Sequence, residues 1–242
     1  RDKFGNIVTH GVDATAPISL SLQQGSGTLA GTTTVNAASG VVDFTGQNVF
    51  IDLVGTDKII RASKPVTTGF GATGVITEDS NVFTITPAPA QHLATAGLGT
   101  VVAGDCNAYV ITSRDPYTNL SGVTSNKTIS LLDSGSGVFY SDASCTTSIT
   151  STSLATGSHT TTVYYKNIVA PQTNSLTFDD GAGGLTPISK PVAVIPAPPS
   201  EFYITGPTAL VSGICSSAFT ALTRDPFGNT SAVTSNTVAS LT

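Results

Sequence analysis

One short motif occurs three times along the chain, and its spacing constrains the fold more than any other feature. The segment Arg114-Asp115-Pro116-Tyr117-Thr118-Asn119 recurs 110 residues later as Arg224-Asp225-Pro226-Phe227-Gly228-Asn229. A third copy, Arg1-Asp2-Lys3-Phe4-Gly5-Asn6, opens the sequence 113 residues before the middle one. Gly-Ser-Gly (25–27 and 135–137) and Pro-Ala-Pro (87–89 and 196–198) recur at offsets of 110 and 109. These anchors agree on a period of about 110 residues, which predicts tandem modules.

The Pro-Ala-Pro segments are the natural boundaries between the predicted modules, because proline cannot donate to a sheet and favours stiff, extended chain. Residues 1–86 are then a module without its first strands, 87–195 are a complete module, and 196–242 begin a third. We therefore expect this sequence to be a window cropped from a longer array.

Composition favours a β protein. Only 10% of the residues are charged and the mean hydropathy is +0.20, which is unlike a disordered chain. Short β-branched or aromatic runs alternate with turn residues, as in a sandwich or barrel. The predicted strands are 18–22, 41–44, 49–53, 58–62 and 82–85 in the first module, and 109–113, 127–132, 138–140, 160–166, 175–178 and 192–195 in the middle one.

Charge and hydropathy exclude two classes of partner. The net charge of -5 argues against nucleic acid, which needs a basic face. The ten Lys and Arg are scattered, so no polybasic patch for a membrane surface is predicted, and no apolar run approaches the roughly 18 residues of a membrane span.

The segments 2–6, 18–20, 25–33 and 40–45 together resemble the bacterial immunoglobulin-like repeats of the Big/invasin type. This resemblance implies an all-β fold of immunoglobulin-like sandwiches in an extracellular stalk or adhesin. The family carries no catalytic motif, so no enzymatic activity, cofactor or metal is expected.

Three cysteines in a chain rich in Thr and Ser suggest an oxidising compartment. Cys106 and Cys145 fall in the same predicted module, and a sandwich would bring them together, so we expect them to form a disulfide. Cys215 stands nine residues before Arg224, much as Cys106 stands eight before Arg114. We therefore expect Cys215 to be unpaired here because its partner lies beyond the end of the sequence. A free catalytic or metal-binding thiol is the less favoured interpretation.

The repeated motif itself is the main candidate site. Asp115 and Asn119 could supply oxygen ligands to calcium, but Asp, Pro, Gly and Asn together more often form a turn. The turn is the favoured interpretation for all three copies, whose polar residues are Arg1, Asp2, Asn6, Arg114, Asp115, Asn119, Arg224, Asp225 and Asn229. The acidic segment 179–181 is likewise interpreted first as a hairpin tip.

Other residues give weaker signals. His10, His92 and His159 lie in unrelated repeat phases, so no Ser-His-Asp triad is expected. Gly-Ser-Gly is followed by no helix and is no phosphate loop. Lys127 or Lys166 could join an isopeptide cross-link, which would need a buried Asn and acid in contact.

The sequence thus predicts a structural or adhesive stalk module on a bacterial cell surface, with neighbouring repeats as its first partners and a receptor or glycan as a further one. Two alternatives stay open: a filament subunit that binds copies of itself by strand complementation, and a carbohydrate-binding module.

Overall fold

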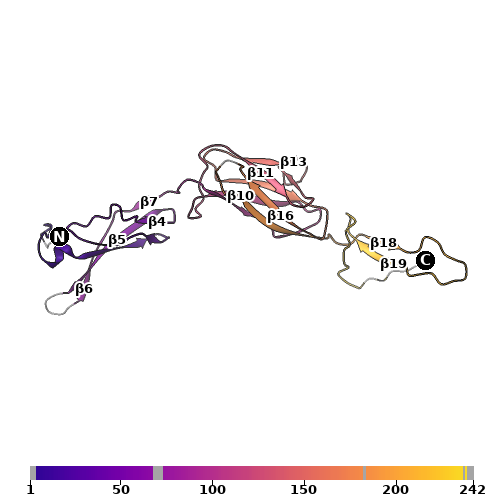
Figure 1. The fold of residues 1–242 in the computed structure, drawn as a ribbon, viewed down its shortest axis with the longest axis horizontal. Helices are drawn as coiled ribbons and strands as arrows, with labels where there is room; N and C mark the ends of the chain where they lie inside the picture. The colour runs from indigo at the N-terminus through magenta and orange to yellow at the C-terminus, as the bar shows by residue number, and fades with distance from the viewer. Residues whose placement is uncertain (1–3, 68–72, 182–183, 237, 239–242) are drawn as a thin grey trace. The chain divides into compact units, whose positions relative to one another are not determined.

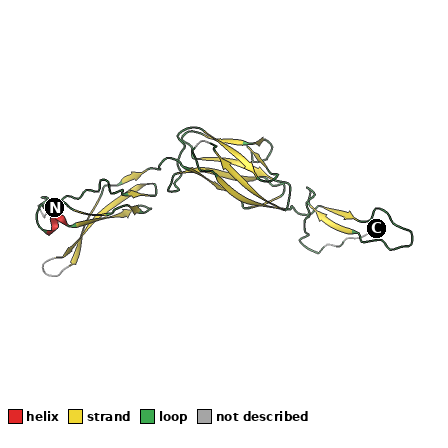
Figure 2. Cartoon of the chain, viewed as in Figure 1, coloured by secondary structure: helices red, strands yellow, loops and turns green. Residues whose placement is uncertain are grey.

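A computed structural model describes residues 4–67, 73–181, 184–236 and 238. Nearly all of its regular structure is β-strand, and one short 3-10 helix, η1 (Val12–Thr15), lies near the N-terminus (Figure 2). The predicted all-β class is confirmed. The chain divides into two compact units, one formed by 1–88 with 117–119 and one by 89–116 with 120–242.

The first unit is built on an antiparallel sheet of order β3-β1-β5-β6, with β7 pairing the first part of β5. A two-stranded ribbon, β2 with β4, pairs Leu29 with Ile51. The strands are β1 (Pro17–Gln24), β2 (Leu29–Ala30), β3 (Thr34–Asn36), β4 (Phe50–Ile51), β5 (Gly55–Thr67), β6 (Thr73–Asp79) and β7 (Phe83–Ile85).

The middle of the chain, in the second unit, is a sandwich of two five-stranded sheets (Figure 1). One has the order β13-β12-β15-β10-β8 and the other β14-β11-β16-β17-β9. The strands are β8 (His92–Ala96), β9 (Thr100–Val102), β10 (Asn107–Arg114), β11 (Lys127–Asp133), β12 (Val138–Tyr140), β13 (Ser148–Ile149), β14 (Ser151–Leu154), β15 (Thr160–Lys166), β16 (Gln172–Asp179) and β17 (Ile188–Ile195).

Strict alternation along the strands creates the core of this sandwich, because side chains of a strand point to opposite faces in turn. In β10, Tyr109 and Ile111 are fully buried, and in β16 Leu176 and Phe178 are. These side chains pack between the two sheets in one apolar cluster. The cluster holds seven valine or isoleucine residues, four aromatic residues and five leucines.

A hairpin follows the sandwich in the second unit. It joins β18 (Glu201–Thr205) and β19 (Thr220–Arg224), and it pairs Glu201 with Arg224. In the sandwich, β8 and β10 pair in the same manner, with His92 opposite Arg114. The pairing register of the two strand pairs therefore follows the recurrence of the sequence motif.

The predicted strands of the sandwich all lie within described strands, whereas three predictions in the first unit need correction, of which 82–85 only loses its first residue. Segment 41–44 is no strand, since only Val41 forms an isolated bridge, with Ala38. The chain turns there because Oδ1 of Asp43 accepts the amide of Thr45 at 2.8 Å. This hydrogen bond also lowers the pKa of Asp43. Segment 49–53 shortens to Phe50–Ile51.

The Pro-Ala-Pro segment before β18 is more than a linker. Ala197 is buried, its amide donates to Oδ2 of Asp225 at 3.0 Å, and its carbonyl accepts the hydroxyl of Ser231. The division into three modules stays a prediction.

The disulfide between Cys106 and Cys145 is confirmed, with Cα atoms 5.8 Å apart. It ties the loop before β10 to the loop between β12 and β13. Asp142 orders the second loop by accepting the amides of Ser144, Thr146 and Thr147, and the Thr147 amide is the main cause of its lowered pKa. Cys215 is an exposed free thiol.

Candidate functional site: the repeated Arg-Asp turn

The motif forms a turn at the end of β10 and again at the end of β19, and the two turns have the same main-chain hydrogen bonds. Each is closed by an isolated bridge, between Arg114 and Leu120 in one copy and between Arg224 and Thr230 in the other. In each, a serine amide two residues past the asparagine donates back to the strand, over 3.1 Å from Ser121 and 3.0 Å from Ser231. The local fold thus repeats with the sequence.

Asp225 organises the turn of the second copy. Its side chain is fully buried, and both carboxylate oxygens accept two hydrogen bonds each. Oδ1 accepts the amides of Phe227 and Asn229 at 3.0 and 2.9 Å. Oδ2 accepts the amide of Ala197 at 3.0 Å and Nδ2 of Asn229 at 2.8 Å. The carboxylate therefore acts as the acceptor for four N–H groups.

The electrostatics of Asp225 reflect this arrangement. Desolvation is the largest single influence and acts to raise the pKa, but the hydrogen bonds from Asn229, Ala197 and Phe227 together outweigh it. The net result is a pKa below the ordinary aspartate value. Asp115, the equivalent residue, is also fully buried.

Asn229 uses its whole carboxamide. One Nδ2 hydrogen goes to Asp225, as above, and Nδ2 also donates to the carbonyl of Ile168 at 2.8 Å. Its Oδ1 accepts the amide of Ala170 at 2.9 Å. The turn is thereby fastened to the loop between β15 and β16.

Asn119 makes the corresponding contacts within the first unit, to which residues 117–119 belong. Its Nδ2 donates to the carbonyl of Asp52 at 2.8 Å, and its Oδ1 accepts the amide of Val54 at 3.2 Å. This acceptor segment lies between β4 and β5. The asparagine is buried, with 8% of its surface exposed.

The aromatic residue of the motif packs beside each turn. Tyr117 contacts Phe50, with ring centroids 5.4 Å apart. Phe227 lies against Gly104, where an added Cβ would come within 2.3 Å of the ring, so only glycine leaves room for it. The guanidinium of Arg224 lies 3.4 Å from the ring centroid of Tyr203, which is the geometry of a cation–π contact.

The sequence identified the aspartates and asparagines of the motif. It did not identify the main-chain groups that the asparagines bind. In the first copy, Arg1 and Asp2 lie outside the described residues, and Asn6 is exposed. The acceptor segments 52–54 and 168–170 carry no common residue pattern. Only main-chain atoms of these segments are used, so no sequence signal could have revealed them.

A second group of polar residues lies inside the sandwich. Nδ2 of Asn174 donates to Oη of Tyr165 at 2.7 Å and to Oδ2 of Asp133 at 3.0 Å, while Oη of Tyr165 donates to the same carboxylate at 3.3 Å. Desolvation is the main cause that raises the pKa of Tyr165 to about 12. Every member faces the interior of the sandwich, so the group stabilises the fold.

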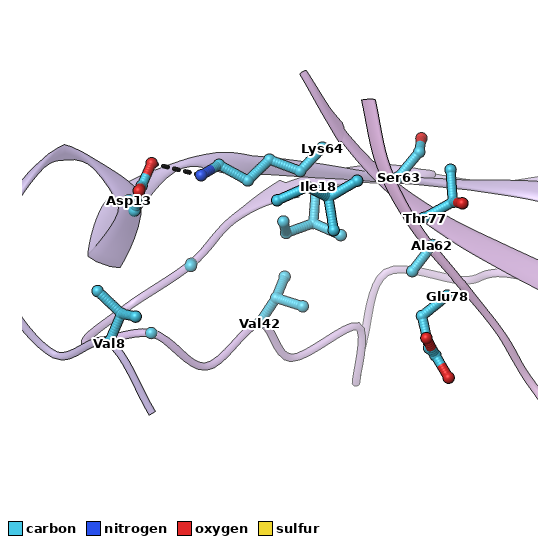
Figure 3. Close-up of a pocket in the computed structure, with 12 residues that line it drawn as sticks. Val8, Asp13, Ile18, Val42, Ala62, Ser63, Lys64, Thr77 and Glu78 are labelled. Carbon is cyan, nitrogen blue, oxygen red and sulfur yellow. Dashed lines mark hydrogen bonds and ion pairs between the residues drawn. The ribbon is translucent and has the colours of Figure 1, made fainter. Parts of the chain in front are cut away.

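A hollow of about 290 Å³ lies in the first unit (Figure 3). Its wall is apolar where Ile18, Val42 and Ala62 line it, and an ion pair between Lys64 and Asp13 lies at one side. More than half of the Asp13 side chain surface is exposed, whereas the Lys64 side chain is mostly covered. Nothing in this lining sets up a nucleophile with a base.

Lys127 and the acidic segment 179–181 make contacts that stabilise the fold. Nζ of Lys127 lies 3.5 Å from Oδ2 of Asp180, whose side chain is fully buried. Oδ1 of Asp179 accepts the amide of Gly181 at 2.8 Å, as expected for an acidic tip. Among the described residues, no group of three His, Cys, Asp or Glu side chains is placed to hold a metal ion.

Comparison with known proteins gives no family for the chain. No family model matches it, and neither does any curated protein. Among solved structures it is similar to the β-glucuronidase of Parabacteroides merdae (TM-score 0.34, 13% identity, 74% of this chain and 21% of that one). It is also similar to a β-glucuronidase of glycoside hydrolase family 2 (TM-score 0.38, 11% identity, 76% and 18%). A third is the FN1–FN3 segment of chicken CNTN1 (TM-score 0.35, 9% identity, 87% and 66%).

The chain spans about a fifth of the length of these glucuronidases, and the similarity to all three is too weak to support an argument about function. In the described part of the chain, no helix has the length and apolar character needed to cross a membrane.

Proposed function

We propose that this chain is a structural or adhesive segment of an extracellular bacterial surface protein, built from tandem immunoglobulin-like repeats of about 110 residues. The observation that carries the proposal is the recurrence of one strand pair and turn, with His92 opposite Arg114 and Glu201 opposite Arg224. Sequence and pairing register recur together, as they do in proteins made of stacked repeats.

Two further observations support an extracellular, non-enzymatic role. The disulfide between Cys106 and Cys145 is the kind of bond that persists in oxidising surroundings. The carboxylate of Asp225 accepts four hydrogen bonds, all from N–H groups of its own turn and of neighbouring segments. A stalk needs such rigid turns, and an active site needs acceptors that face a substrate.

The test uses antibodies against residues 87–195, applied to intact and to lysed cells of the source organism. Labelling of intact cells, lost after mild treatment with an external protease, is expected. Labelling only after lysis would refute the surface location. A binding screen of the same chain against host-cell receptors and glycan arrays then separates an adhesive segment from a passive spacer.

A further inference from the structure

The two asparagines make the same pair of contacts on different segments. Each Nδ2 donates to the carbonyl of one residue, and each Oδ1 accepts the amide two residues later. The atoms are Asp52 O and Val54 N for Asn119, and Ile168 O and Ala170 N for Asn229. A carboxamide offers a donor and an acceptor side by side, as a peptide group does, so it can replace one residue of a strand.

The acceptor side chains do not take part. The first segment reads Asp-Leu-Val and the second Ile-Val-Ala, which differ in charge, size and shape. In the second segment, the intervening amide of Val169 is already bound by Oδ1 of Asn167 at 2.9 Å. That bond leaves the carbonyl of Ile168 and the amide of Ala170 to the incoming carboxamide.

The orientation of the carboxamide is fixed by its own turn. In the second copy, Nδ2 of Asn229 donates to Oδ2 of Asp225. If the carboxamide were flipped, its oxygen would face this carboxylate oxygen, and two acceptors would meet. The donor is therefore directed to a carbonyl and the acceptor to an amide. Aspartate at this position would place oxygen against the Ile168 carbonyl and lose both donated hydrogen bonds.

We propose that the asparagine closing each motif is a docking residue for the main chain of a neighbouring repeat, and that Asn119 and Asn229 are two instances of one recurring joint. Its partner is the loop that leads into β5 or β16, recognised through a carbonyl and an amide two residues apart. The assignment of the two segments to neighbouring repeats rests on the proposed function, whereas the contacts themselves rest on the hydrogen bonds.

The first test observes the joint in the unaltered chain by NMR. Scalar coupling across hydrogen bonds is expected between the Ala170 amide nitrogen and Cγ of Asn229, and between the Val54 amide nitrogen and Cγ of Asn119. Absence of both couplings, in spectra that resolve the backbone couplings of β16 and β17, overturns the proposal. This measurement needs no variant and so does not depend on any variant folding.

The second test uses hydrogen exchange with reciprocal controls. Asn229→Ala should speed exchange of the Ala170 amide at least about tenfold and leave Val54 unchanged, and Asn119→Ala should do the reverse. Asn229→Asp should match Asn229→Ala, while Val169→Thr and Leu53→Thr should leave both amides as they are. Unchanged exchange at Ala170 in Asn229→Ala, or a large effect of the acceptor side chains, would overturn the proposal.

The two failures can be told apart. Both measurements are made on the purified chain, so they do not depend on where the protein resides or what it binds. If the chain shows the couplings but lies inside the cell, the proposed function is refuted and the joint is supported. If the protein lies on the cell surface but shows no couplings, the proposed function is supported and the joint is refuted.

Discussion

Asn174 donates through Nδ2 to the phenolic oxygen of Tyr165 over 2.7 Å, inside the apolar core of the middle sandwich. The ring of Tyr165 also packs edge-on against that of Tyr109, whose centroid lies 6.1 Å away. Both tyrosines are fully buried, and desolvation is the main cause that raises the pKa of each to about 12. This pair makes the stability of the sandwich sensitive to alkali.

Alkaline pH should therefore destabilise the protein. In the unfolded chain, tyrosine loses its proton near pH 10, whereas in the fold both residues keep it until about pH 12. The stabilisation is complete below pH 10 and is lost as the pH rises from 10 towards 12. Urea unfolding from pH 7 to 11.5 measures this. Tyr109→Phe should flatten the decline and the exposed Tyr117→Phe should not; equal slopes in all three proteins would contradict the assignment.

Removal of the disulfide should cost about 4 kcal/mol of unfolding free energy, because the bond closes a loop of 39 residues in the unfolded chain. The double variant Cys106→Ser with Cys145→Ser tests this by urea denaturation. Cys215→Ser alters an exposed thiol and is the matched control, with no change expected. A double variant as stable as the parent would show that the bond adds nothing.

Asp225→Ala should lower the unfolding free energy by about 2 kcal/mol, since it leaves buried N–H groups without an acceptor. Its lowered pKa also predicts acid sensitivity. The stabilisation is present above the unfolded-state pKa and is lost as the pH falls through the lower value of the folded state. The protection factor of the Ala197 amide, which corrects the exchange rate for its intrinsic pH dependence, should fall in acid and in the variant. Asp105→Asn, on an exposed loop, is the control, and the idea fails if it behaves in the same way.

Gly137→Ala should destabilise the sandwich by about 1–3 kcal/mol through overpacking. An added Cβ would lie 2.1 Å from Oη of Tyr165, and the hydrogen bond of that oxygen to Asn174 leaves the ring little freedom to move. Gly99→Ala is the matched control, because no heavy atom lies within 4 Å of its added Cβ. Calorimetric melting of both variants decides, and equal melting temperatures would be inconsistent with the contact.

Local patterns predicted six of the ten strands of the sandwich because alternation and burial coincide there, as in β10 and β16. They failed at 41–44, where the apolar Val41 and Phe44 suggested a strand but the Asp43 side chain stabilises a bend. They also missed β6 in the first unit, whose Val75 and Ile76 stay exposed. In the sandwich they missed β8, β9, β13 and β14, which are two to five residues long. For the candidate site, the sequence revealed the asparagines, while their acceptors are main-chain atoms that every residue possesses.

The loop ordered by Asp142 has a consequence for how the disulfide forms. Three amides that surround Cys145 in the chain point to one carboxylate, so this cysteine is presented from a preorganised loop. Preorganisation raises the effective concentration of one thiol at the other. Cys106 should thus meet Cys145 of its own chain before it meets the exposed Cys215 of another, and crosslinked aggregates should be rare during oxidation, except where the carboxylate has been removed.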